Sequence, residues 1–328
     1  MKKLSDMGER KAIDIVSAIF KTKDVAVGIG DDCAAIDIGE KYLLITTDMI
    51  SQRTHIPKQM TPFQMGWFVV AINLSDIAAK GGVPIGLVLS FGLPKDTSEK
   101  FLKQLAEGAN KCAIDFDTHI IGGDMKETSE ITLCGTAFGT VKKKEFMSRK
   151  GIKADDILAV TGNLGKAGLG YFSIKLESHK NALSKHLFEP IPRLKEGIEL
   201  AQQKCITSCM DISDGLSSSL YQLQKLNNVG FEVDLKMIPI SKGLIGLKKK
   251  NRDIDIYKIA LNFGGDYELL VTIPEIKFEE VEKNLRKIGC KLIAIGKATN
   301  ENKIMVFDGN VKEPLENLGY EHFKKHLF

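Results

Sequence analysis

Six short segments of this sequence each place an aspartate beside glycine, serine, threonine or asparagine. A single aspartate in such a setting most often caps a helix or lies in a turn. Six of them in one chain raise the alternative that their carboxylates converge on one site. In chain order the segments are Gly28-Ile29-Gly30-Asp31-Asp32, Thr46-Thr47-Asp48, Asn73-Leu74-Ser75-Asp76, Gly122-Gly123-Asp124, Asp211-Ile212-Ser213-Asp214-Gly215-Leu216 and Gly264-Gly265-Asp266-Tyr267-Glu268-Leu269.

Two of these aspartates fit a capping role poorly. Asp76 falls inside a predicted helix near its apolar face, where a carboxylate needs a cation or hydrogen-bond donors. Asp48 follows the apolar residues 42–47, at a strand end where α/β proteins place ligand-binding groups. Converging carboxylates repel one another, and a divalent cation removes that conflict. Oxygen ligands favour Mg²⁺, Mn²⁺ or Ca²⁺ over zinc, and the spacing is not that of an EF-hand loop, so we expect Mg²⁺ bridging aspartates and phosphates.

The neighbouring glycines and serine suit phosphate binding. Gly122 and Gly123 allow backbone N–H groups to approach phosphate oxygens closely. Ser213 and Asp214 precede a predicted helix, whose amino terminus offers unpaired N–H groups and a positive dipole, although Asp214 also suits a simple N-cap.

Two common nucleotide motifs are missing from the sequence. Residues 162–167 come nearest to a Walker A motif, but the glycine spacing is wrong and alanine replaces serine or threonine. The sequence also lacks a dinucleotide-binding fingerprint. Any nucleotide must therefore be bound by a different kind of phosphate-binding site.

Alternating strand and helix patterns position these segments. Thr61-Pro62-Phe63-Gln64 predicts a capped helix start, and Gly81-Gly82 predicts its end near residue 80. Gly122-Gly123-Asp124 is predicted to form a turn between two strands. The further predicted strands are residues 42–47, 83–90, 119–121, 131–141, 156–161, 266–273 and 292–295, and the further predicted helices are 96–113, 164 onward, 215 onward and 279–288.

A chain of 328 residues is long enough for two domains. The patterns predict an α+β protein with a mixed α/β amino-terminal domain and an α/β carboxyl-terminal domain. We place the boundary in the polar segment 142–153, giving domains 1–145 and 146–328.

Composition excludes several other classes of protein. The net charge is +4, and the lysine runs 142–144 and 248–250 are short and lack aromatic residues, so we expect no nucleic-acid partner. No stretch approaches the ~20 apolar residues of a membrane span, and we expect no membrane association. The six cysteines form no C-x-x-C pair and predict reduced thiols in a cytoplasmic protein.

The sequence resembles the thiamine-monophosphate kinase family, within the superfamily of aminoimidazole-ribonucleotide synthetase and selenophosphate synthetase. The matching segments follow the family's order and span nearly the whole chain. They are GIGDDCA from Gly28, TTD from Thr46, NLSDIAAKGGVP from Asn73, IGGD from Ile121, SRKGIKADDILAVTG from Ser148, MDISDGL from Met210 and GGDYELL from Gly264.

The resemblance implies a fold, a reaction and a set of site residues. It implies a homodimer paired through the amino-terminal sheet, with ATP, several Mg²⁺ ions and thiamine monophosphate as the acceptor. The acceptor phosphate oxygen is already anionic, so no general base is needed, and Arg149 would stabilise the transferring group. The implied metal ligands are Asp32, Thr46, Thr47, Asp48, Asp76, Asp124, Asp211 and Asp214; the ATP contacts are Gly123, Asp124, Arg149 and Ser213; and His55 is the substrate contact.

The sequence departs from the family pattern on the acceptor side. Gly265 stands where a glutamate is expected, and Met125 where a threonine commonly follows Gly-Gly-Asp. No tryptophan precedes Gly319-Tyr320, where the family tends to carry one; Tyr320 and Phe263 are the alternative aromatic surfaces.

Two alternatives remain open at this point. One is another ATP-dependent enzyme of the superfamily that acts on a different phosphorylated or carboxylate acceptor. The chain lacks the cysteine before Cys33 expected of a selenophosphate synthetase, and the terminal cysteine expected of a hydrogenase-maturation relative. The other is a non-catalytic nucleotide-binding subunit, which the complete set of aspartates argues against.

Overall fold

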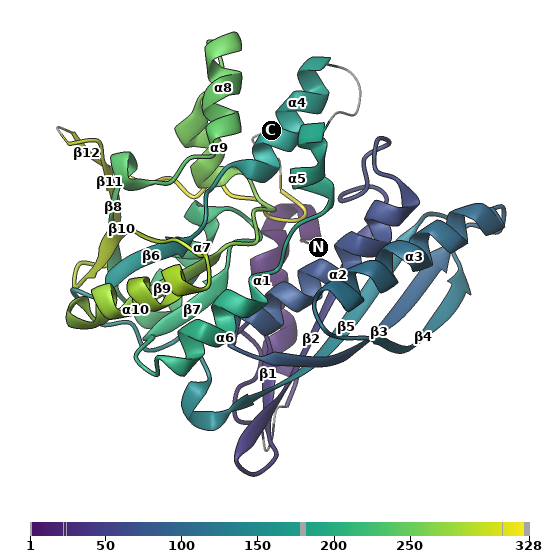
Figure 1. The fold of residues 1–328 in the computed structure, drawn as a ribbon, viewed down its shortest axis with the longest axis horizontal. Coiled ribbons are helices and arrows are strands. Elements are labelled where there is room, and N and C mark those ends of the chain that lie inside the picture. Colours follow the sequence, from purple (N-terminus) through teal and green to yellow (C-terminus); the bar gives the residue numbers. More distant parts are fainter. Residues whose placement is uncertain (1, 22, 24, 178–181, 310, 325–328) are drawn as a thin grey trace.

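The described part of the chain forms two β-sheets with helices packed against them (Figure 1). The structure is a computed structural model that describes residues 2–21, 23, 25–177, 182–309 and 311–324. None of the helices in these ranges combines the length and hydrophobicity that a membrane span requires.

The amino-terminal sheet has five strands in the order β1-β2-β5-β3-β4. Strands β3 and β4 are parallel and the other pairs are antiparallel. Helices α2 and α3 pack on one face of this sheet (Figure 1). The elements are α1 (Leu4–Ile19), β1 (Ala34–Asp37), β2 (Lys41–Ser51), α2 (Pro62–Ala79), β3 (Val83–Leu93), α3 (Glu99–Asp115), β4 (Ile120–Glu127) and β5 (Thr132–Lys142).

The carboxyl-terminal sheet has seven strands in the order β12-β11-β8-β10-β6-β9-β7. A short helix, η1 (Lys143–Glu145), connects the two sheets, and the domain boundary we placed after residue 145 stays a prediction. The strands are β6 (Ile157–Thr161), β7 (Ser208–Asp211), β8 (Gly230–Asp234), β9 (Leu269–Ile273), β10 (Leu292–Thr299), β11 (Ile304–Phe307) and β12 (Lys312–Pro314). The helices are α4 (Lys166–Glu177), η2 (Ala182–Ser184), α5 (Lys185–Phe188), α6 (Leu194–Gln202), α7 (Leu216–Asn227), η3 (Leu235–Met237), α8 (Lys242–Lys250), α9 (Ile256–Asn262) and α10 (Glu275–Lys287).

Helix α2 packs against both halves of the molecule. It packs on the amino-terminal sheet and also against α6 and β7, so nearly all of its side chains are buried. The predicted capping box is confirmed, because Thr61 and Gln64 exchange side-chain and backbone hydrogen bonds. The predicted end is also confirmed: Gly81 has φ +67° and the Gly82 N–H bonds to Ile77 O at 2.9 Å, which closes the last turn.

Three predicted boundaries are wrong in ways that affect the site. Strand β2 continues to Ser51, so Asp48 lies within the strand and not at its end. Residues 122–124 belong to β4, where Gly123 pairs with Leu89 of β3, and they do not form a turn. Strand β9 begins only at Leu269, which leaves 266–268 in a loop. Glycine has little β propensity, so the sequence pattern did not predict that β4 continues beyond residue 121.

Candidate active site

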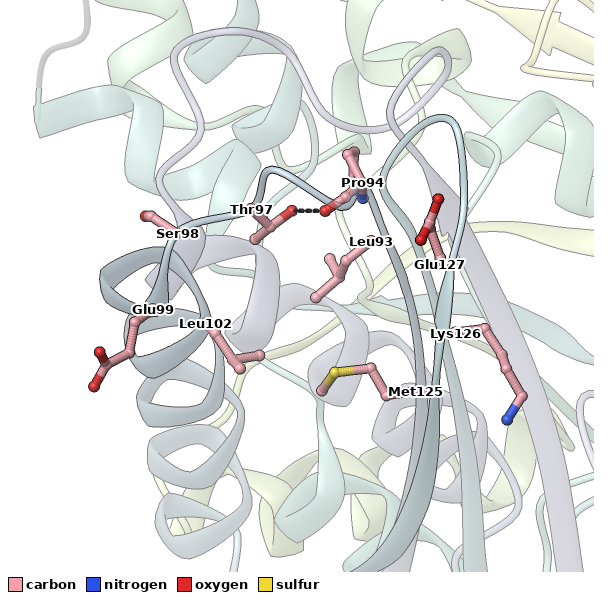
Figure 2. A pocket seen from close by; sticks show the side chains of 9 residues that line it. All are labelled: Leu93, Pro94, Thr97, Ser98, Glu99, Leu102, Met125, Lys126 and Glu127. Carbon is pink, nitrogen blue, oxygen red and sulfur yellow. Dashed lines mark hydrogen bonds between the residues drawn. The ribbon is translucent and has the colours of Figure 1, made fainter.

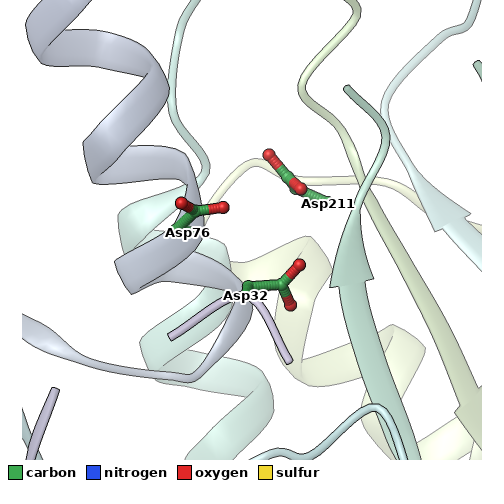
Figure 3. A group of neighbouring side chains, drawn as sticks. All are labelled: Asp32, Asp76 and Asp211. Carbon is green, nitrogen blue, oxygen red and sulfur yellow. The ribbon is translucent and has the colours of Figure 1, made fainter. Parts of the chain in front are cut away.

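Three aspartates from three separate segments converge where α2 meets the carboxyl-terminal domain (Figure 3). Asp32 lies two residues before β1, Asp76 lies in the last turn of α2, and Asp211 ends β7. One carboxylate oxygen from each lies within 4.8 Å of the other two. Asp32 and Asp211 are buried and Asp76 is half-buried, so this group is poorly hydrated.

The segment before Asp76 holds the neighbouring strands in place. The Asn73 side chain accepts a hydrogen bond from the Asp48 backbone N–H at 3.0 Å and donates to Val69 O at 2.8 Å. Ser75 Oγ donates to Asp211 Oδ2 at 2.6 Å. This part of α2 therefore fixes β2 and Asp211 at the same time.

Strand β2 contributes a donor to the same group. Thr46 Oγ1 donates to Asp76 Oδ2 at 2.5 Å. Thr46 and Asp48 lie on the face of the sheet that α2 covers, because alternate residues of a strand share a face.

Two cations lie on one side of the group. Arg149 Nε donates to Asp32 Oδ1 at 2.9 Å, and Lys80 Nζ lies 2.7 Å from Asp32 Oδ2. Burial alone would raise the pKa of Asp32, but Arg149 and Lys80 together hold that pKa below its usual value. Asp32 is therefore the one carboxylate of the three that the chain neutralises by itself.

The remaining carboxylates lack enough positive charge around them. Burial, with Asp48 and Asp211 nearby, raises the pKa of Asp76 well above its usual range. Burial and the neighbouring Asp32 raise the pKa of Asp211 to about 7 and that of Asp48 to about 6. These carboxylates therefore hold protons more readily than a free aspartate does, and a nearby cation would lower their pKa values.

The donor set fits a hard divalent cation. Asp32 Oδ2 is buried, and the Lys80 ammonium lies 2.7 Å from it. All the converging ligand atoms are carboxylate oxygens, which Mg²⁺ and Mn²⁺ prefer.

Asp214 and Ser213 lie beside this group at the start of α7. Burial, with Glu9 nearby, raises the pKa of Asp214 to about 6, and Asp48 contributes to that shift. Ser213 O accepts the Gly265 N–H at 2.7 Å, which ties this loop to residues 263–268.

Three predicted site residues do not join the aspartate group within this chain. The Thr47 side chain lies on the opposite face of the sheet from Thr46, where its Oγ1 donates to Gly135 O at 2.9 Å. Gly123 and Asp124 lie on the edge strand β4, and the exposed Asp124 pairs with Lys126 at 3.1 Å. That hydrogen bond from Lys126 lowers the pKa of Asp124, in contrast to the raised values in the group.

The pocket next to β4 is not the centre of the carboxylate chemistry. It has a volume of about 270 Å³ and lies between β3, β4 and the start of α3 (Figure 2). Leu93, Leu102 and Met125 form part of its lining, whereas Asp32, Asp76 and Asp211 do not. Met125 therefore points to the helix-covered side of β4, away from Asp124.

His55 belongs to an aromatic cluster that the sequence did not indicate. Its ring centroid lies 5.2 Å from that of His322, and Tyr320 packs edge-on against His322 at 4.9 Å. Burial and the neighbouring His322 lower the pKa of His55 to about 4, so its ring is neutral at physiological pH. The Tyr320 N–H bonds to Asp214 O at 2.9 Å, which places the cluster beside the carboxylates.

The loop before β9 contains one departure from the family pattern. Gly265 has φ +95°, a conformation in which glutamate would be strained. Tyr267, at φ +50°, packs edge-on against Phe68 of α2, and burial and nearby carboxylates raise the pKa of its phenol. Phe263 instead packs against Tyr171 and Phe172 within the carboxyl-terminal domain.

Comparison with known proteins identifies the family. Residues 30–141 match the N-terminal domain, and residues 153–309 the C-terminal domain, of AIR synthase related protein. A thiamine-monophosphate kinase of Pyrococcus horikoshii is 34% identical over 297 residues, which cover 90% of this chain and 91% of that protein. This chain belongs to the thiamine-monophosphate kinase family. The resemblance read from the seven segments is thus confirmed.

Solved structures of the thiamine-monophosphate kinase family share the whole fold. AaThiL complexed with AMPPCP and TMP aligns with a TM-score of 0.87 at 26% identity, covering 98% of this chain and 99% of that one. Thiamine-monophosphate kinase from Stenotrophomonas maltophilia K279a aligns with a TM-score of 0.75 at 29% identity, covering 89% and 94%. The predicted two-domain α+β class is confirmed.

The raised pKa of Asp211 predicts a pH dependence of stability. With EDTA present, wild-type protein should lose stability relative to Asp211→Asn between about pH 5 and pH 7. The folded pKa of about 7 exceeds the ~3.9 of an unfolded chain, so the folded state binds more protons there and stability falls as pH rises. Urea unfolding of both proteins at both pH values measures this. The titration of His55 contributes equally to the stability of wild type and of Asp211→Asn. An identical pH response of the two proteins would show that the Asp211 pKa is not raised.

Proposed function

We propose that this protein transfers the γ-phosphoryl group of ATP to thiamine monophosphate, giving thiamine diphosphate. The observation that carries the proposal is the convergence of Asp32, Asp76 and Asp211 in a chain of this family. AaThiL, which has nearly the same fold, has been solved in complex with AMPPCP and TMP.

The aspartate group is the proposed magnesium site. Asp32, Asp76 and Asp211 would hold Mg²⁺ directly, with Asp48, Asp214 and Thr46 beside them. Bound Mg²⁺ would screen the repulsion between the anionic phosphates of donor and acceptor. The residues themselves align the two substrates, and no side chain needs to remove a proton, because the attacking phosphate oxygen is already ionised.

We assign the phosphates of ATP to a position next to the aspartate group, near the start of α7. Ser213 and Asp214 lie just before α7, whose amino terminus favours phosphate. Arg149 donates a hydrogen bond to Asp32, which supports a role for its guanidinium in pairing with the transferring phosphoryl group. Gly123 and Asp124 are the remaining proposed ATP contacts.

A homodimer is the proposed assembly, and it explains why Thr47 and Asp124 lie apart from the group. The sheet face that α2 and α3 leave open carries Thr47, and Asp124 pairs with Ser90 on the same face. Met49 on this face is 61% exposed and Val83 is 53% exposed, which is costly for a face left in water. A second copy paired through this face would place Thr47 and Asp124 in the interface.

The aromatic cluster of His55, Tyr320 and His322 is the proposed contact for the rings of the acceptor. A neutral His55 and the Tyr320 ring offer stacking surface beside Asp214. Tyr320 is therefore preferred to Phe263 as the replacement for the missing tryptophan. Several residues on the acceptor side, including Gly265, differ from the family pattern. A different phosphorylated acceptor is therefore the second candidate for the substrate. We place the enzyme in the cytoplasm, where its six free cysteines would stay reduced.

The function is tested by following thiamine diphosphate by mass spectrometry. Wild-type protein with ATP and Mg²⁺ should form it from thiamine monophosphate and not from thiamine. Asp76→Asn should stay folded but turn over roughly 100-fold slower or worse, because it removes a proposed metal ligand. Asp115→Asn, which breaks an exposed ion pair on α3, is the matched control and should be fully active. ADP release without thiamine diphosphate would overturn the acceptor, and a fully active Asp76→Asn would overturn the metal site.

Tyr320 is predicted to set the affinity for the acceptor. Tyr320→Ala should raise the KM for thiamine monophosphate about tenfold, the equivalent of ~1.4 kcal/mol of lost stacking, and leave the KM for ATP unchanged. Tyr320→Phe, which keeps the ring, should resemble wild type. Steady-state kinetics with each substrate varied in turn measures both constants. An unchanged acceptor KM in Tyr320→Ala would remove this residue from the substrate site.

The proposed dimer predicts the sedimentation behaviour of the protein. Wild type should sediment as a dimer, and Met49→Lys should shift it to monomer, because a charge at the centre of a buried sheet face is costly. Met237→Lys, at another exposed methionine in the carboxyl-terminal domain, should leave the dimer intact. A monomeric wild-type protein, or a dimeric Met49→Lys, would contradict pairing through this face.

A further inference from the structure

A fully buried lysine lies directly behind the aspartate group. Lys80 follows the last residue of α2, and its side chain has no exposed surface. Its Nζ lies 2.5 Å from Asp31 Oδ1, 2.7 Å from Asp32 Oδ2 and 2.9 Å from Cys209 O. The ammonium group has three N–H donors and three oxygens around it, so burial leaves no unmet donor.

These contacts take Asp31 out of the set of candidate metal ligands. Asp31 Oδ1 accepts from Lys80 Nζ and from the Asp32 N–H, at 2.5 and 3.0 Å. Its Oδ2 accepts from Ser148 Oγ and from the Arg149 N–H, each at 3.0 Å. Both oxygens are thus engaged by the chain itself, although Asp31 adjoins Asp32 in the sequence.

Lys80 also connects the three segments that carry the converging carboxylates. It touches Asp32 directly, and it lies one turn after Asp76 on the same helix. Through Cys209 O it contacts β7, two residues before Asp211. A single side chain therefore links the loop, the helix and the strand whose relative positions set the distances within the group.

We propose that Lys80 is a positioning residue that sets the spacing of Asp32, Asp76 and Asp211 for a divalent cation. The proposal rests on the metal site assigned under the proposed function. Charge alone would act in the opposite direction, because removing an ammonium group beside carboxylates strengthens their attraction for a cation. The two effects therefore predict opposite signs for the same substitution.

The test is a titration of the full-length protein with Mn²⁺ alone, in which electron paramagnetic resonance measures the free and bound Mn²⁺. Lys80→Met keeps the side-chain volume and removes the charge, and it should weaken Mn²⁺ binding about 10- to 100-fold, as is typical when a residue orienting metal ligands is lost. The Mg²⁺ concentration for half-maximal activity should rise by a similar factor, while turnover at saturating Mg²⁺ stays near wild type.

The control is Lys166→Met, which removes a lysine paired with the buried Glu268 at 2.5 Å, in the carboxyl-terminal domain. It should bind Mn²⁺ as wild type does, even if its stability is lower. Circular dichroism checks folding, and if Lys80→Met does not fold, Lys80→Gln, which keeps two N–H donors, is judged by the same criterion. Unchanged or tighter Mn²⁺ binding in the Lys80 variant would overturn its positioning role alone. A wild-type protein that binds no Mn²⁺ would instead overturn the metal site on which the proposal rests.

Discussion

Like charges held close together inside a protein repel one another strongly, and this repulsion between carboxylates is the constraint around which the molecule is arranged. Asp32, Asp76 and Asp211 bring their oxygens within 4.8 Å in poorly hydrated surroundings. Arg149 and Lys80 neutralise the Asp31–Asp32 side, whereas Asp48, Asp76 and Asp211 have raised pKa values. A fold that retains such a cluster of buried carboxylates carries a cost in stability, and perturbed pKa values of this kind are typical of functional sites.

The packing of α2 brings the site together from both domains. Asp76 belongs to the amino-terminal domain and Asp211 to the carboxyl-terminal one, and they meet because α2 packs against β7. Ser75 reinforces that contact through its hydrogen bond to Asp211. Neither domain alone could form the group, so the group depends on close packing between the two domains.

Local sequence signals predicted those parts of the structure that depend on neighbouring residues. The capping box at Thr61 and the apolar face of α7, with Leu216, Leu220 and Leu223, follow from short-range patterns. The number and settings of the aspartates raised convergence as an alternative; Asp32, Asp76 and Asp211 do lie together, whereas Asp124 lies apart. Residues 122–124 were predicted to form a turn, because their pairing with β3 depends on tertiary context that a Gly-Gly sequence does not indicate.

Contacts between residues far apart in the chain could not be predicted from the sequence. Nothing near Lys80 in the sequence signals that it meets Asp31 and Cys209, and nothing near His322 signals its contact with His55. The alternation of β2 explains why Thr46 faces Asp76 while its neighbour Thr47 does not, but the buried face could be chosen only once α2 was placed.

The central claim is that Mg²⁺ replaces protons on these carboxylates. Isothermal titration of the protein with Mg²⁺ at about pH 6.5, in two buffers of different ionisation enthalpy, measures the protons released on binding. Because Asp211 has a pKa of about 7 and Asp76 one well above its usual range, the account predicts a net release of protons and a binding heat that differs between the buffers. Equal heats in both buffers, or no binding at all, would contradict it.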